Sequence, residues 1–421
     1  MTNFFQQCIA PDCRAEFDLD ARLYVCSRCG GLLDIERREP IAATSLRDVW
    51  QNRRGSGVWR FREFLPFTDD TPIVSLGEGN TPLYDAPRSA DYCRLPQLKL
   101  KHQGCNPTGS FKDTGMTVAV TQARKLGARL VVCASTGNTA ASLAAYAARA
   151  DLMCAIVVPS GQVSHAKLAQ ALDYGAKVLE VDGNFDTCMN LIRELAEDES
   201  VYLVNSINPF RIEGQKTVAF ELAEQLDWRM PDHLVVPGGN LGNSSAFGKG
   251  FRELFESGLI KTQPKITVVQ AEGAAPFARF YSAREHESFV NDEHPHTLAS
   301  AIKIGAPVSW QKAWRAVRET GGSVITVSEQ EIADAKAVIG RDGIGCEPAS
   351  ATTVAGIRKL EFNENESVVA VLTGHVLKDT DYVIKYHSNN LIAPDGTVLA
   401  STFANNPIRV QSVKSVVDLL R

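Results

Sequence analysis

The 421-residue sequence lacks any apolar stretch long enough to span a bilayer, and its first residues lack the basic and apolar regions of a signal peptide. It also lacks a basic excess, because 44 lysines and arginines stand against 49 aspartates and glutamates, for a formal net charge of −5. This balance gives no general affinity for nucleic acids or anionic membranes. We therefore expect a cytoplasmic protein with neither a nucleic-acid nor a membrane partner.

The ten cysteines do not form the pattern of a disulfide framework, because four of them cluster and the others are scattered singly. The cluster reads Cys8-x4-Cys13 followed by Cys26-x2-Cys29. Two such pairs are typical of a zinc ribbon, in which four thiolates close a tetrahedral metal site. Four reduced cysteines without a metal are the alternative. Since residues 8–38 carry both signs of charge and no basic stripe, a structural role is favoured over nucleic-acid binding.

Most of the chain alternates short apolar runs with amphipathic helical patterns. Repeated strand–helix units of this kind predict an α/β protein with two open, mostly parallel sheets flanked by helices, and a cleft between the sheets. Ahead of them, residues 40–65 are interpreted as a linker with a docked helix, and Ile73–Leu83 as a strand–turn–strand unit. The predicted strands of the two sheets are 98–101, 129–134, 154–158, 177–181, 201–204, 233–236, 266–270, 323–327 and 367–372.

The segments that follow these strands are the candidates for a site, because ligands in open α/β sheets bind beyond the carboxyl ends of the strands. Glycine, asparagine, serine and threonine recur in Ser135–Thr139, Asn205–Arg211, Gly238–Asn243 and Thr373–Asp379. Gly238–Asn243 is predicted to cradle a phosphate, since its glycines let backbone amides approach an anion at the positive end of a helix. It does not have G-x-G-x-x-G spacing, and an ordinary helix start is an equally open interpretation.

Lys112, in the segment Asn106–Asp113, stands where a predicted strand gives way to a predicted helix. A lysine wedged between Phe111 and a buried helix is a candidate for desolvation, which lowers the pKa of an amine and favours the neutral nucleophile that forms Schiff bases. Single lysines are usually surface residues. Here two anion-ready turns and Arg211 favour a phosphorylated cofactor with an anionic substrate beside it.

These segments resemble the threonine synthase family, in the fold type II group of pyridoxal-phosphate enzymes whose architecture is similar to the tryptophan synthase β subunit. The similarity covers nearly all residues from about 70 to 380 and is carried, in matching order, by the motifs NPTGSFKD, CASTGNT, NSINPFRIEGQKT, TLASAIKIG, EPASATT and TGHVLKD. The resemblance implies pyridoxal 5′-phosphate as cofactor, a phosphorylated amino acid as substrate and a homodimer. The implied reaction converts O-phosphohomoserine and water to threonine and phosphate.

The resemblance also implies a role for each site residue. Lys112 would form the Schiff base with the cofactor, Asn138 would bond the cofactor's 3′-oxygen, and Thr373 its pyridine nitrogen. A hydroxyl at that nitrogen, in place of a carboxylate, leaves it largely unprotonated and favours elimination and replacement chemistry. The cofactor phosphate would be held by Gly238, Gly239, Asn240, Leu241, Gly242 and Asn243. The substrate's phosphate and carboxylate would be bound by Ser135, Thr139, Asn205 and Arg211.

The expected domain organisation has three parts. Residues 1–45 form the zinc-ribbon-like segment with Cys8, Cys13, Cys26 and Cys29 as metal ligands. Residues 46–105 together with 216–421 form a large cofactor-binding domain, and residues 106–215 form a small mobile domain.

Three departures from the family's usual pattern leave the substrate open: Thr114, the segment 101–105 and Val376, all expected near the site. Two other activities therefore stay under consideration. One is a β-replacement on O-phosphoserine with sulfite, as in cysteate synthase, and the other is a lyase similar to threonine or serine dehydratase. A hypothesis from another class, a zinc-ribbon regulator with an inactive enzyme body, is opposed by the intact Lys112 and the complete Gly238–Asn243 loop.

Overall fold

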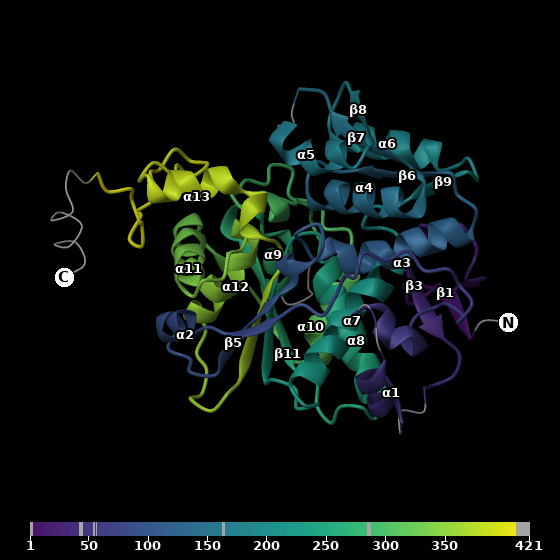
Figure 1. Cartoon of the computed structure of the whole chain (residues 1–421), viewed down its shortest axis with the longest axis horizontal. Helices are drawn as coiled ribbons and strands as arrows, with labels where there is room; N and C mark the ends of the chain where they lie inside the picture. The colour runs from purple at the N-terminus through teal and green to yellow at the C-terminus, as the bar shows by residue number, and fades with distance from the viewer. Residues whose placement is uncertain are drawn as a thin grey trace.

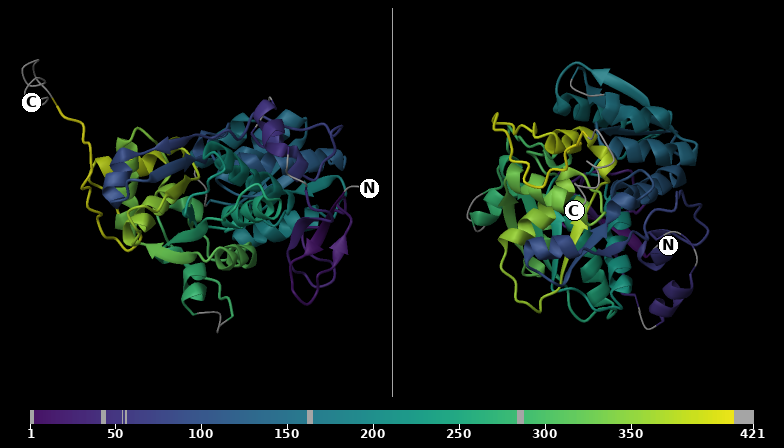
Figure 2. Two further views of the ribbon diagram at one scale, coloured as in Figure 1. Left: turned by 90° about the horizontal axis from the view of Figure 1, so that it is seen from below. Right: turned by 60° about the vertical axis from the view of Figure 1, so that its left-hand side comes forward.

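The computed structural model describes residues 3–41, 45–53, 55, 57–161, 165–283 and 288–409, except for the side chains of 165–167. Two open sheets and a small antiparallel sheet form within these residues, and helices cover both faces of the open sheets (Figure 1 and Figure 2). The predicted α/β architecture is confirmed.

The larger sheet has six strands in the order β12-β11-β10-β13-β5-β4, parallel except for β4, which pairs antiparallel with β5 at one edge. Neighbouring side chains of β10 enter opposite cores, as the two-residue repeat of a strand requires. Leu234 and Val236 pack towards α7, α8 and α10, whereas Val235 packs towards α2, α11 and α12. The strands are β4 Leu83–Asp85, β5 Leu98–His102, β10 His233–Pro237, β11 Lys265–Ala271, β12 Ser323–Val327 and β13 Val368–Leu372. The helices are α2 Pro87–Cys93, α7 Phe210–Gln225, α8 Gly242–Glu256, α10 Trp310–Glu319, α11 Glu329–Arg341 and α12 Pro348–Lys359.

The smaller sheet has four parallel strands in the order β8-β7-β6-β9, and with α4–α6 it forms the upper part of Figure 1. One face packs on α3, α4 and α5, and the other on α6. The strands are β6 Leu130–Ala134, β7 Met153–Pro159, β8 Lys177–Val181 and β9 Val201–Leu203, and the helices are α3 Lys112–Lys125, α4 Asn138–Ala150, α5 His165–Asp173 and α6 Phe185–Leu195. All nine predicted strands of the two sheets are present, with ends shifted by no more than one residue.

The prediction of a strand–turn–strand unit at Ile73–Leu83 is wrong, since only the last of these residues begins a strand, β4. The backbone amides of this loop bond to side chains instead of to a neighbouring strand. Gly79 N donates to Asn106 Oδ1 (2.9 Å) and Asn80 N donates to Glu221 Oε2 (2.8 Å). The alternating apolar residues in the sequence therefore mark a loop that is held by distant polar side chains.

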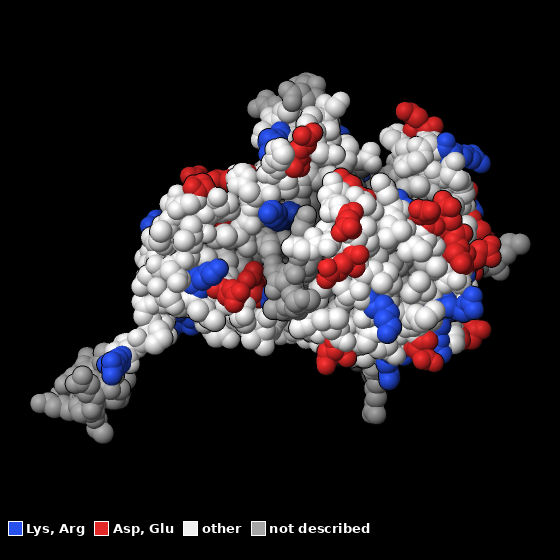
Figure 3. Space-filling view, turned by 90° about the horizontal axis from the view of Figure 1, so that it is seen from above, with Lys and Arg blue, Asp and Glu red and all other residues white. Residues whose placement is uncertain are grey.

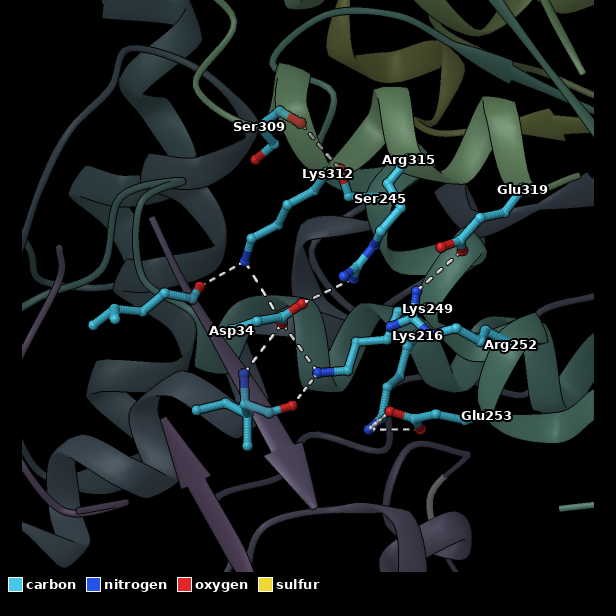
Figure 4. A network of polar contacts seen from close by, with 12 residues as sticks. Asp34, Lys216, Ser245, Lys249, Arg252, Glu253, Ser309, Lys312, Arg315 and Glu319 are labelled. Atoms are coloured by element: carbon cyan, nitrogen blue, oxygen red, sulfur yellow. Dashed lines mark hydrogen bonds and ion pairs between the residues drawn. The ribbon is translucent and has the colours of Figure 1, made fainter. Parts of the chain in front are cut away.

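Asp34 fastens the N-terminal segment to the body of the protein (Figure 4). Its carboxylate is 2% exposed and pairs with Lys249 of α8 at 3.0 Å. It also pairs with Lys312 (3.6 Å) and Arg315 (3.3 Å) of α10, and Lys312 donates to the carbonyl of Leu33 at 2.6 Å. Burial alone would raise the pKa of Asp34, but the three cations hold it well below its usual range. The small sheet of this segment has the order β2-β1-β3, with β1 Phe4–Cys8, β2 Glu16–Phe17 and β3 Leu33–Arg37.

The segment that follows, predicted as a linker with a docked helix, contains the helix Leu46–Asn52 (α1) and the short helix Trp59–Phe64 (η1). Trp50 is fully buried and its ring stacks on Phe220 of α7 with centroids 6.1 Å apart. The remaining short elements are η2 Gln103–Cys105, η3 Glu272–Ala274, α9 Pro276–Ser282, η4 Ser300–Ile302, η5 Val376–Lys378 and α13 Thr380–His387.

None of the helices in the described part of the chain is both long and apolar enough to cross a membrane. On the face shown in Figure 3, acidic and basic side chains are interspersed and the basic ones are not gathered into a stripe.

Candidate active site

A cavity of about 1490 Å³ lies at the carboxyl ends of strands from both open sheets. Its walls come from the segments that follow β5, β6, β9, β10 and β13, which is where ligands bind in open α/β sheets. The following sequence-predicted residues line it: Lys112, Ser135, Asn138, Thr139, Asn205, Arg211, Gly239, Asn240, Leu241, Gly242, Asn243 and Thr373. The predicted residue Gly238 does not line it.

Lys112 is the first residue of α3, and its ammonium nitrogen lies 3.9 Å from the centroid of the Phe111 ring. Burial lowers the pKa of Lys112 to about 7, and the positive charge of Arg211 adds to this effect, while Glu347 opposes it. A substantial fraction of the amine is therefore neutral near neutral pH, which is the form that attacks a carbonyl. This lowered pKa agrees with the desolvation expected from the sequence.

The loop before Lys112 is fixed from two sides. Asp113 is fully buried and accepts hydrogen bonds from the amide (2.7 Å) and hydroxyl (2.6 Å) of Thr108 and from the hydroxyl of Ser142 (2.6 Å). Burial raises the pKa of Asp113 to about 6. On the other side, Phe111 N donates to the carbonyl of Thr373 at 2.8 Å. These contacts hold the lysine at the end of β13.

The turn between β10 and α8 has the geometry of an anion cradle. Leu241 adopts a left-handed conformation (φ 63°) and α8 begins at Gly242, so free amides at the helix start face the cavity. Asn240 is held on both sides, by Val308 N donating to its Oδ1 (2.8 Å) and by its own Nδ2 donating to Ser206 Oγ (3.0 Å). Gly238 remains a prediction only, and its amide donates to the carbonyl of Val269 at 2.7 Å instead of facing the cavity.

Glu347 joins two of the predicted cofactor ligands and was not itself predicted as one of the site residues. It is 4% exposed, and its Oε2 accepts from Asn138 Nδ2 (2.9 Å) while its Oε1 accepts from Thr373 Oγ1 (3.1 Å). Burial raises the pKa of Glu347, and the two hydrogen bonds and Lys112 oppose that rise. A side chain at position 374 would collide with this carboxylate, because a Cβ on Gly374 would lie 2.3 Å from Glu347 Cδ.

Arg211 is a buried cation without a carboxylate partner among the described residues. It is 3% exposed, its Nη1 reaches only the carbonyl of Val204 at 3.4 Å, and its Nε has no hydrogen-bond partner. Burial lowers its pKa to about 10. A buried charge of this kind is costly unless it is paired, so the geometry favours an anionic ligand at this point of the cavity.

Asn205 lines the cavity and stays a predicted substrate ligand, but its side chain also bonds within the protein. Its Oδ1 accepts from Ala134 N and its Nδ2 donates to the carbonyl of Ala134, both at 3.0 Å. The amide therefore joins the ends of β6 and β9 and shapes the cavity wall. Ser135, three residues ahead of α4, and Thr139, its second residue, both line the cavity.

Comparison with known proteins shows which family has this arrangement. A family model described as "Pyridoxal-phosphate dependent enzyme" matches residues 74–374. The chain is 46% identical over 390 residues to a threonine synthase of Methanocaldococcus jannaschii, covering 90% of this chain and 94% of that protein. The chain belongs to the threonine synthase family of pyridoxal-phosphate dependent enzymes. A threonine synthase of Methanosarcina acetivorans is 45% identical over 378 residues, covering 89% of this chain and 92% of that protein. The structure of Escherichia coli threonine synthase shares the fold, with a TM-score of 0.66 at 19% identity, covering 91% of this chain and 92% of that chain.

The residues of the cavity fit the cofactor of this family. Lys112 supplies an amine of lowered pKa, and the start of α8 supplies amides for a phosphate. Two buried donors beside that turn, Gln103 Nε2 and Ser244 Oγ, have no hydrogen-bond partner within the described residues. When bound, the cofactor supplies an electron sink for breaking bonds at the substrate's carbon atoms.

The pKa of Lys112 gives a testable pH dependence for a member of this family. Cofactor capture by protein stripped of pyridoxal phosphate requires the neutral amine, which is present above its pKa. The capture rate is expected to rise about tenfold per pH unit below pH 7 and to level off above about pH 8, because the pKa of Lys112 is lowered to about 7. Stopped-flow absorbance measures this rate. A capture rate that still rises steeply between pH 8 and 10 would show that Lys112 has the pKa of an ordinary lysine.

The departures from the family's usual pattern lie near the cavity in the sequence, but few of these residues line it. Thr114 is fully buried and donates to the carbonyl of Phe111 at 2.8 Å, and Lys101 is fully buried in an ion pair with Glu221. Neither residue lines the cavity, nor does Val376. Within the segment 101–105, only Gly104 and Cys105 reach it. Of the departing residues, only Gly104 and Cys105 therefore stand where they can contact a ligand in the cavity.

Proposed function

We propose that this protein converts O-phosphohomoserine and water to threonine and phosphate. The observation that carries the proposal is the buried Arg211, which has no ion-pair partner in the described part of the chain and opens onto the same cavity as Lys112. Relatives named threonine synthase, at 45–46% identity over about nine-tenths of the chain, support it. The cavity is large enough for the cofactor and a small phosphorylated amino acid together.

The residue roles follow from the site. The guanidinium of Arg211 would grip the substrate phosphate with parallel hydrogen bonds. Ser135 and Thr139 would bind the other end of the substrate at the start of α4. Lys112, with a pKa of about 7, can both accept and donate a proton near neutral pH and would carry protons between the substrate carbons. Glu347 would hold Asn138 and Thr373 against the cofactor ring.

The deciding experiment measures phosphate release from O-phosphohomoserine by the purified holoenzyme and identifies the amino-acid product. We expect phosphate and threonine in equal amounts. Phosphate release from O-phosphoserine with sulfite incorporation, and no turnover of O-phosphohomoserine, would show the β-replacement instead. Release of ammonia from threonine or serine alone would show the dehydratase activity.

We also propose that the cysteine segment holds a structural zinc ion. The sulfur atoms of Cys8, Cys13, Cys26 and Cys29 all lie within 4.8 Å of one another, whereas Zn–S bonds of about 2.3 Å in a tetrahedron separate sulfurs by roughly 3.8 Å. Gly31 suits this cluster, since a Cβ there would lie 3.2 Å from Cys8 Sγ and 3.3 Å from Cys29 Sγ.

Metal analysis of protein purified without chelator is expected to give about one zinc per chain. Cys26→Ser is expected to reduce the zinc content to near zero and to lower the melting temperature, because the ion is bound by the folded segment alone. Cys105→Ser, which changes an exposed cysteine outside the cluster, is the matched control and should leave both unchanged. A wild-type zinc content near zero would end this proposal.

A homodimer, a cytoplasmic location and the domain division at residues 45, 105 and 215 are further proposals. The two open sheets, with most of the smaller one's elements between residues 112 and 203, support that division. Light scattering of the purified protein tests the dimer.

A further inference from the structure

A second, smaller cavity of about 340 Å³ lies between α11, α13 and the segment 403–405 near the end of the described chain. Its volume is near the lower end of the range for small-molecule sites. It takes no part in the proposed reaction, because the two cavities share no lining residue.

Lys336 is the feature that distinguishes this cavity from an ordinary gap between helices. Its side chain lines the cavity, it is 9% exposed, and within the described residues it makes neither a hydrogen bond nor an ion pair. It projects from α11 beside an apolar cluster that includes Ala333, Ala337 and Tyr382. Burial lowers its pKa, which Cys346 and Asp379 partly oppose. Lysines are rarely this deeply buried, and Asp379 is the acidic side chain that acts on Lys336, so its place on the cavity wall favours an anionic ligand there.

Two further basic groups line the same cavity. Arg341, one turn and a half further along α11, donates from Nη2 to the carbonyl of Phe403 at 3.3 Å and keeps its other guanidinium nitrogens free of described carboxylates. His387 accepts from Asn405 N at its Nδ1 (2.9 Å), so its neutral ring carries the proton on Nε2 and can donate there. Burial lowers the pKa of His387, and the positive charges of Lys336 and Arg341 add to this effect.

We propose that this cavity is a binding site for a small anion carrying a phosphate or carboxylate group, with Lys336 as its buried cationic ligand and Arg341 and His387 as donors nearer the surface. The site stands independently of the proposed reaction. Its ligand could be free phosphate or a small carboxylic acid, since both present oxygen acceptors to the same donors.

The position of the site gives it a direct connection to the larger cavity. Cys346 and His375 form a β-bridge between the two cavities. Cys346 and Val376 line the smaller cavity, while their neighbours Glu347 and His375 line the larger one. An anion bound to Lys336 would therefore share its cavity with Cys346. The next residue, Glu347, carries the carboxylate that holds Asn138 and Thr373.

Crystals of the holoenzyme soaked with tungstate, a dense tetrahedral dianion, test the site by anomalous scattering. We expect a peak in the smaller cavity of the wild type, no peak there in Lys336→Met, and an unchanged peak in Lys385→Met, which alters an exposed lysine of α13 outside the cavity. A peak at Arg211 serves as the internal control.

Tungstate at Arg211 with none at Lys336 overturns the inference. A peak in the smaller cavity that survives Lys336→Met also overturns it, because such a peak marks an adventitious ion only. A peak at Lys336 without one at Arg211 would support the inference while counting against the proposed substrate.

Isothermal titration of the holoenzyme with inorganic phosphate and with succinate distinguishes the two kinds of ligand. Lys336→Met is expected to weaken binding of the preferred anion at this site at least tenfold, because a charge-assisted hydrogen bond is lost. Lys336→Gln provides a second variant, and the cofactor spectrum and melting temperature of each variant confirm that it folds. Unchanged titrations of both anions in both variants would contradict the inference.

Discussion

Replacement of Lys112 by alanine is expected to abolish the absorbance band of covalently bound cofactor and to lower kcat by about 10³-fold or more, because one amine both attaches the cofactor and moves protons. The structure supports so large an effect. The amine lies in the larger cavity with its pKa lowered to about 7, and the other lysines of the described lining, Lys303 and Lys378, come from other segments.

Absorbance spectra and steady-state phosphate release measure this effect. Lys125→Ala is the matched control on the same helix. It removes an exposed ion pair with Asp20, which contributes at most about 1 kcal/mol to stability, and it should leave the spectrum and the rate unchanged. A Lys112→Ala protein with an unaltered cofactor band would remove the assignment of the site.

Arg211→Met should lower kcat/KM for the phosphorylated substrate by about 10²-fold or more, since breaking a buried charged pair typically costs 2–5 kcal/mol. The cofactor spectrum should be retained, which separates this effect from that of Lys112. Without substrate the variant should be no less stable than the wild type, because the substitution removes a buried charge that has no carboxylate partner in the described residues.

Arg211→Met should also raise the pKa of Lys112, since the guanidinium is the second cause of its lowering after burial. The pH at which cofactor capture levels off should move upward accordingly. Arg193→Met, which changes an exposed arginine of α6 that also lines the cavity, is the matched control and should have a much smaller effect. Equal losses in the two variants would mean that the cavity attracts the substrate by general charge rather than through Arg211.

Much of this architecture could be predicted because its signals are local. The strands were found from apolar runs, and the site from small polar residues at the strand ends. Lys112 and Arg211 stand out in the sequence because each lies in a recognisable motif that follows a predicted strand. The prediction for the loop before β4 is wrong for the opposite reason. The amide of Asn80 in this loop donates to Glu221, which lies far along the chain.

The contacts that could not be predicted join residues far apart in sequence. Glu347 reaches Asn138 across 209 residues, and no periodicity signals such a pair. Gly238 and Asn205 stand in segments that do form the site, yet their polar groups bond to neighbouring strands, which depends on strand order and register. For the same reason the buried Lys336 looks in the sequence like any lysine of an amphipathic helix.

The attachment of the cysteine segment through Asp34 has a consequence for protein synthesis. The hydrogen bond from Lys312 to Leu33 spans 279 residues, so the segment leaves the ribosome long before the α10 part of its docking surface exists. At about 5–20 residues per second, it waits roughly 15–60 s for α10 to emerge. During that interval the segment can pair only with partners made earlier, such as Lys125 of α3, which binds Asp20, and the proposed zinc ion would help to keep it folded until α10 is made.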